Sequence, residues 1–107
     1  MSRIKYDETP LAVWYVDADF TLPTPPTMEE IEDLMERART YHGAISGGPR
    51  HHTLGISISV DARSGWEVAK DVWKILLYEL NLQAKTGLVL TNLRILDEAT
   101  RTAENAA

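Results

Sequence analysis

The chain has 107 residues, of which 44% are hydrophobic and 25% are charged, proportions typical of a folded domain rather than a disordered or fibrous chain. It contains no cysteine, which excludes disulfides, zinc–thiolate sites, iron–sulfur clusters and thiol nucleophiles. A net charge of −5 disfavours nucleic acid as a partner, and the lack of a membrane-spanning stretch or signal peptide predicts a cytoplasmic protein with no membrane partner.

The length fits a single domain over residues 1–107, which begins with an extended polar segment at 1–10. Residues 11–16 (LAVWYV) are all apolar and rich in aromatic and β-branched side chains, so they predict a buried strand. At the other end, residues 97–107 (DEATRTAENAA) are polar. We expect them to form a C-terminal tail that frays or folds into a loose helix.

The first helix follows a proline-rich stretch, residues 17–27, whose three prolines exclude a regular helix or a central strand. Thr27 and Glu30 have the spacing of a capping box, which marks a helix start. Apolar residues then recur every three or four positions, which predicts a helix from residue 28 to about residue 41. Gly43 suits the left-handed residue that closes a helix.

Two strands are predicted in the middle of the chain. Residues 44–48 (AISGG) form a short, weak strand that leads into a Gly–Gly–Pro turn. Residues 53–61 (TLGISISVD) alternate strictly between apolar and small or polar side chains, the pattern of a strand with one buried face. Leucine, isoleucine and valine share one side of this strand, and threonine, glycine and serine share the other.

The second helix and the last strand complete the predicted elements. Ser64 and Glu67 repeat the capping-box spacing and start a helix over residues 65–83. Its expected buried stripe consists of Trp66, Ala69, Trp73, Leu76, Leu77 and Leu80. Further apolar residues, Val68, Val72 and Ile75, make the apolar surface wider than one small sheet requires. Residues 88–96 (LVLTNLRIL) predict the last strand, which is apolar on both sides.

The order of elements is β-α-β-β-α-β, which fits an α+β ferredoxin-like sandwich. That fold has a four-stranded antiparallel sheet, with the first and third strands central and two helices on one face. It brings the end of the first strand beside the start of the third. We therefore expect a polar cluster at that end: Asp17, Asp19, Arg50, His51, His52 and Lys85.

Histidines and aspartates are suitable ligands for a divalent metal. However, His51 and His52 are neighbours on an extended chain and point to opposite faces, so both do not easily reach one ion. We interpret the cluster as a solvated rim with ordinary ion pairs. The sequence thus predicts no metal site and no cofactor.

The uncovered face of the sheet carries the predicted binding site. The first strand is apolar on both sides, and we place Ala12, Trp14 and Val16 on the helical side because that series continues through Ala18 and Phe20. Small residues of the third strand then lie beside an aromatic ring and form a shallow floor on which another surface packs closely. The predicted binding residues are Tyr15, Gly55, Ser57 and Ser59.

We find no GxSxG, GxGxxG or P-loop motif, so the sequence predicts no catalytic residue. The two-sided apolar strands and an acidic first helix favour a non-catalytic protein–protein interaction module, with a second copy or another protein as its partner. The segments HGAISGG, LGISISVDA and WEVAKDVWKIL, within residues 42–76, resemble small uncharacterised ferredoxin-like proteins of actinobacteria and their phages. The resemblance implies this fold and an accessory role in a phage or its host.

Three alternatives share the predicted topology. One is a cofactor-independent enzyme of the dimeric α+β barrel type, similar to small monooxygenases and isomerases, with Trp66, Trp73, Asn92 and a histidine lining a pocket. Another is an amino-acid-binding regulatory domain, which usually has a glycine-rich turn where this chain has prolines. The third is an RNA-recognition domain, which stacks bases on aromatic residues that the third strand here lacks.

Overall fold

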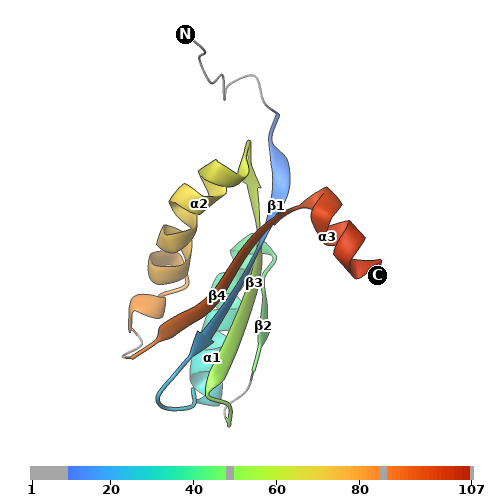
Figure 1. Ribbon diagram of the computed structural model, residues 1–107. Helices are drawn as coiled ribbons and strands as arrows, with labels where there is room; N and C mark the ends of the chain where they lie inside the picture. The colour runs from blue at the N-terminus through green and yellow to red at the C-terminus, as the bar shows by residue number, and fades with distance from the viewer. Residues whose placement is uncertain (1–9, 48–49, 85–86, 107) are drawn as a thin grey trace.

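The computed structural model contains a four-stranded antiparallel sheet (Figure 1). Its strands are β1 (Ala12–Thr21), β2 (Ala44–Ser46), β3 (Thr53–Ala62) and β4 (Val89–Asp97). Their order is β2-β3-β1-β4, so β1 and β3 are central and the other two strands form the edges. The structure describes residues 10–47, 50–84 and 87–106. Most of the expected N-terminal segment, part of the Gly–Gly–Pro turn and Lys85 lie outside the described residues.

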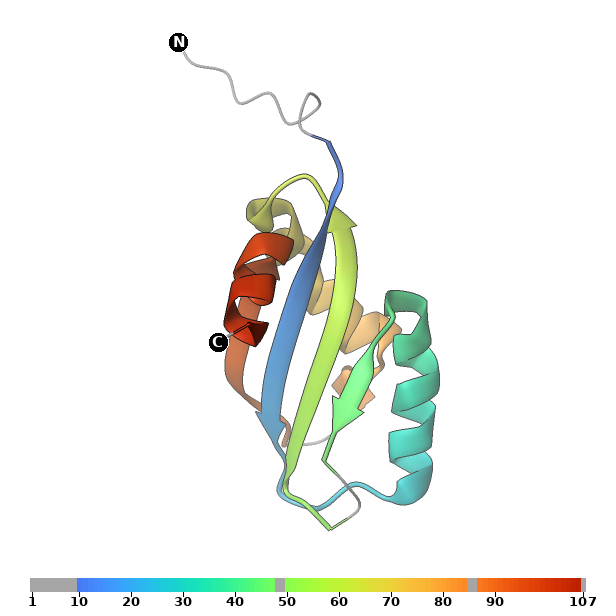
Figure 2. The ribbon, with the colours of Figure 1, turned by 90° about the vertical axis from the view of Figure 1, so that its right-hand side faces the viewer.

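Within the described residues, the three α-helices are α1 (Met28–Ala38), α2 (Gly65–Lys74) and α3 (Glu98–Asn105). Helices α1 and α2 cover one face of the sheet, the helical face, and α3 lies over the opposite, open face (Figure 2). Helix α1 contacts the edge strand β2, whereas α2 contacts the other edge strand, β4. None of the described helices is long and apolar enough to cross a membrane.

The expected α+β class with a four-stranded antiparallel sheet is confirmed. Shorter helical turns extend the main helices: a 3₁₀ turn at Arg39–Tyr41, a π turn at Ile75–Glu79 and a 3₁₀ turn at Leu82–Ala84. The C-terminal segment folds into a helix, which was one of the two expectations for it, since most of the segment is α3. Helix α3 contacts both β1 and β4, so the tail is part of the packed structure.

Helix α1 starts as the sequence predicts. The Thr27 hydroxyl accepts a hydrogen bond from the Glu30 amide at 3.1 Å, and the Glu30 carboxylate accepts one from the Thr27 amide at 3.0 Å. The predicted end is wrong in one detail, since the left-handed residue is His42, with φ 51°, and not Gly43. Gly43 provides space instead: a Cβ there would lie 2.7 Å from the Cβ of Ala38.

Strand β1 extends past the six residues that were predicted, and Asp17 and Asp19 therefore lie inside it. Apolar residues alternate with these two carboxylates, so the strand continues with one buried side and one polar side. The side chains buried on the helical face are Val16, Ala18 and Phe20. The predicted orientation of this strand is confirmed.

Strand β3 shows the alternation that its sequence predicts. Leu54, Ile56 and Ile58 are buried on the helical face. The intervening Gly55 and Ser57 lie opposite Asp19 and Asp17 of β1, on the open face. Because paired residues of antiparallel strands point to the same side, the open face has a polar centre.

Helix α2 begins after Ser64, whose hydroxyl accepts a hydrogen bond from the Glu67 amide at 3.3 Å. Its predicted buried stripe is right for Leu76 and Leu80 and wrong for the other four residues. The buried residues are Val68, Val72, Ile75, Leu76 and Leu80. They follow a spacing of about four residues that continues through the π turn. Trp66, Ala69, Trp73 and Leu77 lie on the exposed side instead. The apolar residues of the helix occupy more than the side that the sheet covers, and the smaller branched residues face the sheet.

The core joins the helical face of the sheet to α1 and α2. Leu76 and Leu80 belong to the same buried cluster as Ile56 and Ile58, in agreement with the sequence. Trp14 packs against the edge of this cluster and contacts the start of α2, where a Cβ on Gly65 would lie 3.3 Å from its ring. Burial on the helical face thus positions α2 across β1, β3 and β4.

Candidate functional site

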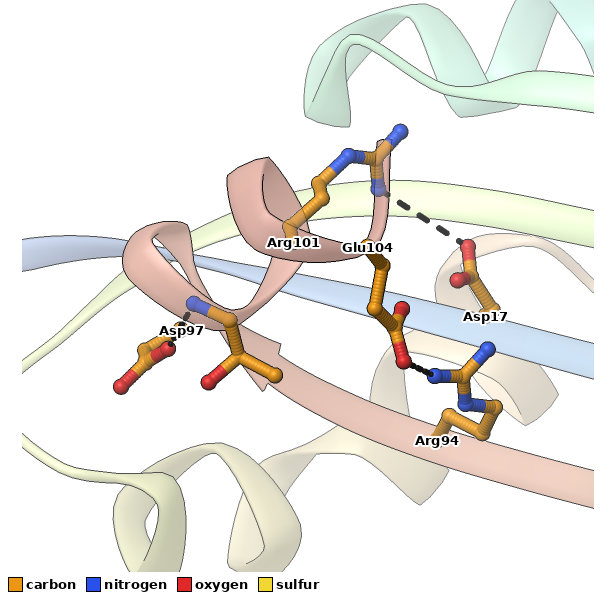
Figure 3. Close-up of polar contacts among 6 residues, drawn as sticks. Asp17, Arg94, Asp97, Arg101 and Glu104 are labelled. Carbon is orange, nitrogen blue, oxygen red and sulfur yellow. Dashed lines mark hydrogen bonds and ion pairs between the residues drawn. The ribbon is translucent and has the colours of Figure 1, made fainter. Parts of the chain in front are cut away.

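The predicted binding residue Tyr15 lies on the open face, where α3 covers it. The Arg101 guanidinium carbon is 4.3 Å from the centre of the Tyr15 ring, a cation–π contact. The same guanidinium lies 4.0 Å from the Asp17 carboxylate (Figure 3). Tyr15 therefore already has an intramolecular partner, contrary to the expectation of a freely exposed apolar floor.

Two other predicted binding residues have contacts within the open face. The Ser57 hydroxyl donates a hydrogen bond to Asp17 at 2.7 Å. Gly55 lies beneath the Ser46 side chain, and a Cβ on Gly55 would be 2.2 Å from the Ser46 oxygen. Glycine at this position thus permits close packing between β2 and β3. That Tyr15, Gly55, Ser57 and Ser59 bind a partner stays a prediction.

A shallow hollow of about 380 Å³ lies between the open face and α3. Its polar lining includes Arg94, which forms an ion pair with Glu104 of α3 (Figure 3). The Asn92 amide donates to the Asp19 carboxylate at 3.1 Å. The charged groups of the hollow therefore have protein partners, and their main effect is to hold α3 on the sheet.

Of the residues that the structure describes, the two aspartates and His52 of the predicted polar cluster do not come together. Asp17 and Asp19 face the middle of β3, whereas His52 lies beyond its start. A ring nitrogen of His52 is 3.1 Å from the Leu22 carbonyl oxygen, and the Leu22 amide donates to the His52 carbonyl at 2.8 Å. Among the described residues, no three histidine, aspartate or glutamate side chains gather to hold a metal ion.

Helix α2 exposes large aromatic side chains that the sequence analysis placed in the core. Trp66 is 80% exposed and Trp73 is 46% exposed. Leu77, four residues after Trp73, is also exposed, and Tyr78 contacts the Trp73 ring edge-on with 6.0 Å between ring centres. Single exposed apolar residues are common, but two tryptophans and a leucine on one side of a helix form a patch.

Contacts of α2 show how this helix is oriented over the sheet. Its C-terminal end faces α1, because Glu79 hydrogen-bonds Tyr41, which follows α1. Burial and this hydrogen bond to the Glu79 carboxylate raise the pKa of Tyr41 to about 12. Since α1 lies toward β2 and α2 toward β4, the flank of α2 that faces away from α1 is turned toward the β4 edge.

Strand β4 adds apolar residues to the same side of the molecule. Leu90 and Leu93 pair with Phe20 and Ala18 of β1, so they point to the helical face. Unlike their partners, they stay exposed, Leu90 at 48% and Leu93 at 40%. Helix α2 leaves this margin of the sheet uncovered.

We call this surface the β4–α2 face and define it as Trp66 and Trp73 of α2, Leu77 of the π turn that extends α2, and Leu90 and Leu93 of β4. This face was not predicted, because the tryptophans were expected in the core. A signal was present: the second helix has more apolar residues than one sheet face needs, and β4 is apolar on both sides. These five residues are half of the ten large apolar side chains that are exposed in the described part of the chain.

Comparison with known proteins finds no matching family model, no similar curated protein and no similar solved structure. No family is shown for this chain. The resemblance to small ferredoxin-like proteins, with the phage or host role that it implies, stays a prediction.

Proposed function

We propose that this protein is a non-catalytic protein–protein interaction module whose contact surface is the β4–α2 face. The observation that carries the proposal is the exposure of Trp66 and Trp73 on one flank of α2. Tryptophan is enriched among the residues that dominate the energy of protein interfaces, because its large ring buries much apolar area. Two such side chains are available beside an apolar strand.

The physical driving force is the removal of apolar surface from water, worth about 25 cal/mol per Å². Charged residues border the patch rather than interrupt it: Glu67, Lys70 and Asp71 line a hollow beside Trp66, and the Lys74 ammonium lies 5.7 Å from the centre of the Trp73 ring. An apolar centre with a polar rim is the usual arrangement of a protein interface.

The finer fold assignment is also part of the proposal. We assign the chain to the ferredoxin-like βαββαβ arrangement. This is supported by the antiparallel pairing, the central positions of β1 and β3, and the placement of α1 and α2 on one face. Helix α3 is then an addition that covers the open face. The interaction surface moves accordingly from the open face to the β4 side.

The test compares substitutions on two helices. Replacing Trp66 and Trp73 together by alanine should weaken any complex at least about tenfold, because hot-spot tryptophans cost about 2 kcal/mol or more. Met35→Ala is the matched control, since Met35 is an exposed apolar residue on α1. Complexes are measured by sedimentation of the purified protein alone and after mixing with each candidate partner.

An unchanged helical circular dichroism signal shows that both variants are folded. Association that is equally strong in the wild type and in the Trp66/Trp73 variant contradicts the proposal, as does a wild type that associates with nothing. Weakening by Met35→Ala instead would move the contact surface to α1.

A further inference from the structure

The two edges of the sheet differ in a way that bears on the partner. Strand β2 is an edge of three residues, whereas β4 is an edge of nine. Proteins usually protect long edges with proline, lysine, bulges or short strands, because a free edge pairs with other strands. Strand β4 has no proline or lysine, and its one irregularity is a bulge at Thr91, beyond which the pairing with β1 is regular from Asn92 to Asp97. No described strand pairs with its outer side.

Charge does not protect the edge either. Arg94 is paired with Glu104, and the Asp97 carboxylate caps α3 by accepting the Thr100 amide at 2.7 Å. Both charged side chains of β4 therefore have partners in α3 of the same chain. The remaining side chains of the strand are uncharged, and a second strand meets no unpaired charge there.

We infer that β4 pairs antiparallel with β4 of a second copy, about a two-fold axis, to form a continuous sheet across a homodimer. This inference rests on the proposed function and names its partner. A two-fold axis suits the geometry, because the same edge supplies both halves of the contact and antiparallel strands satisfy each other's amides and carbonyls.

Edge pairing buries the β4–α2 face at the same time. The two helical faces lie on the same side of the continuous sheet, so the α2 flank of one copy approaches that of the other. Leu90 and Leu93, at the margin of one sheet, then lie in the middle of the joined sheet. One association thus covers both the unpaired backbone edge and the exposed tryptophans.

The exposed area is of the right size. The five residues of the β4–α2 face, together with Tyr78, expose on the order of 700 Å² by the usual areas of such side chains. A standard interface buries about 800 Å² on each partner. The backbone of β4 adds buried area to that of these side chains. A second copy therefore supplies a contact large enough for a stable dimer.

Sedimentation over a hundredfold range of protein concentration is the first test. We expect the wild type to be dimeric at the upper end, and Leu93→Lys to weaken association at least tenfold because it buries an unpaired charge. Met35→Lys, which places the same charge on α1, should leave association unchanged. Circular dichroism establishes that each variant is folded.

Cysteine crosslinking locates the contact, because the chain has no cysteine of its own. Single cysteines are placed at each position from Val89 to Leu96. The yield of disulfide-linked dimer should peak at one position and decline on both sides, because in antiparallel self-pairing only the residue at the two-fold axis faces its own copy. Ser59→Cys probes the open face predicted from the sequence, and Met35→Cys is the control.

The outcomes separate the two proposals. A dimer with crosslinks that peak on β4 supports the inference. A wild type that stays monomeric, or crosslinks that form best at Ser59, overturns it. If the wild type is monomeric but a different protein binds it in a manner lost in the Trp66/Trp73 variant, the proposed function stands without self-pairing. If no complex depends on those tryptophans, both proposals fail.

Discussion

The two faces of the sheet are covered in different ways. On the helical face, α1 and α2 bury a continuous apolar cluster that includes Val16, Ile56 and Leu76. On the open face, α3 has no buried residue and is held by Arg101 against Tyr15 and Asp17, and by the Arg94–Glu104 pair. Apolar burial stabilises by several kcal/mol per residue pair of this kind, whereas an exposed ion pair contributes about 0–1 kcal/mol.

Because of this difference, substitutions on the helical face should change the global stability of the molecule, and substitutions on the open face should change only the order of α3. Loss of a contact on the helical face should unfold the whole molecule more easily, because the core is shared by the sheet and both helices. Loss of a contact on the open face should release α3 while the sheet and core stay intact. Packing on the helical face thus determines the fold. On the open face, the weak contacts of α3 should let the helix detach and return while the rest stays folded.

The largest effect is expected from Leu76→Ala. Leu76 is buried in the core, and removal of its side chain should lower the free energy of unfolding by about 2–5 kcal/mol. Leu77→Ala is the matched control, since Leu77 is exposed and the variant should lose less than about 1 kcal/mol. Urea denaturation followed by circular dichroism measures both. Similar losses in the two variants would show that the face assigned to α2 is wrong.

A smaller loss is expected where α1 meets the sheet. Gly43→Ala places a Cβ 2.7 Å from the Cβ of Ala38 and 3.2 Å from Ile58, so the helix must move or the contact must be strained. Overpacking of this kind costs about 1–3 kcal/mol. His42→Gly should have the opposite sign, because glycine adopts the left-handed conformation without strain. Thermal unfolding of the two variants checks the pair, and stabilisation by Gly43→Ala would contradict the packing.

Arg101→Ala should affect α3 and little else. It removes the contact with the Tyr15 ring and the ion pair with Asp17, so α3 should exchange its amide hydrogens faster. The free energy of global unfolding should change by no more than about 1 kcal/mol, because the contacts are exposed and screened by solvent. Arg37→Ala, which breaks an ion pair with Asp33 on α1, should leave α3 unchanged. Cooperative unfolding of the sheet with α3 would refute this separation.

The smallest effect is the acid response of α3. Hydrogen bonds from Thr100 to the Asp97 carboxylate hold the pKa of Asp97 below its ordinary value of 3.8. A lowered pKa favours the folded helix above the ordinary value, and this contribution is lost as the pH falls through the folded pKa. We expect α3 resonances to shift toward those of an unfolded segment below that pH. Asp97→Asn keeps a capping side chain and should remove this titration.

Local patterns in the sequence predicted much of this architecture. The capping box at Thr27, the helix start at Ser64 and the alternation in β3 are short-range signals, and each is confirmed. They depend on hydrogen bonds or side-chain directions within a few residues. The α+β class then follows from the order of the elements.

The incorrect predictions concern features that tertiary packing determines, such as which side of α2 is buried. Helix α2 has apolar residues on more than the side that the sheet covers, and the sheet selected Val68 and Val72 rather than Trp66 and Trp73. The stripe of larger residues was preferred in the sequence analysis, although branched residues pack more closely on a sheet. Similarly, Asp17 and Asp19 made β1 look as if it ended early. Their polar partners lie on the neighbouring strands β3 and β4, which are distant in the sequence.

Helix α3 was missed as a packed element because its sequence is polar and its contacts are long-range. Arg101 reaches Tyr15, and Arg94 reaches Glu104, only once β4 has brought the C-terminal residues across the sheet. No short-range sequence pattern predicts such contacts. The β4–α2 face was hidden for the same reason: exposure depends on how far α2 covers the sheet, and that is fixed by packing alone.

The pairing of β4 is tested most directly by amide hydrogen exchange of β4, measured at low and at high protein concentration. Alternate amides of β4 point away from β1, and within the described residues no strand accepts them. We predict that these amides become protected as the concentration rises, while the amides of α3 exchange at the same rate throughout. If the outward amides of β4 exchange as fast as those of α3 at both concentrations, the edge is unpaired and a second copy does not cover it.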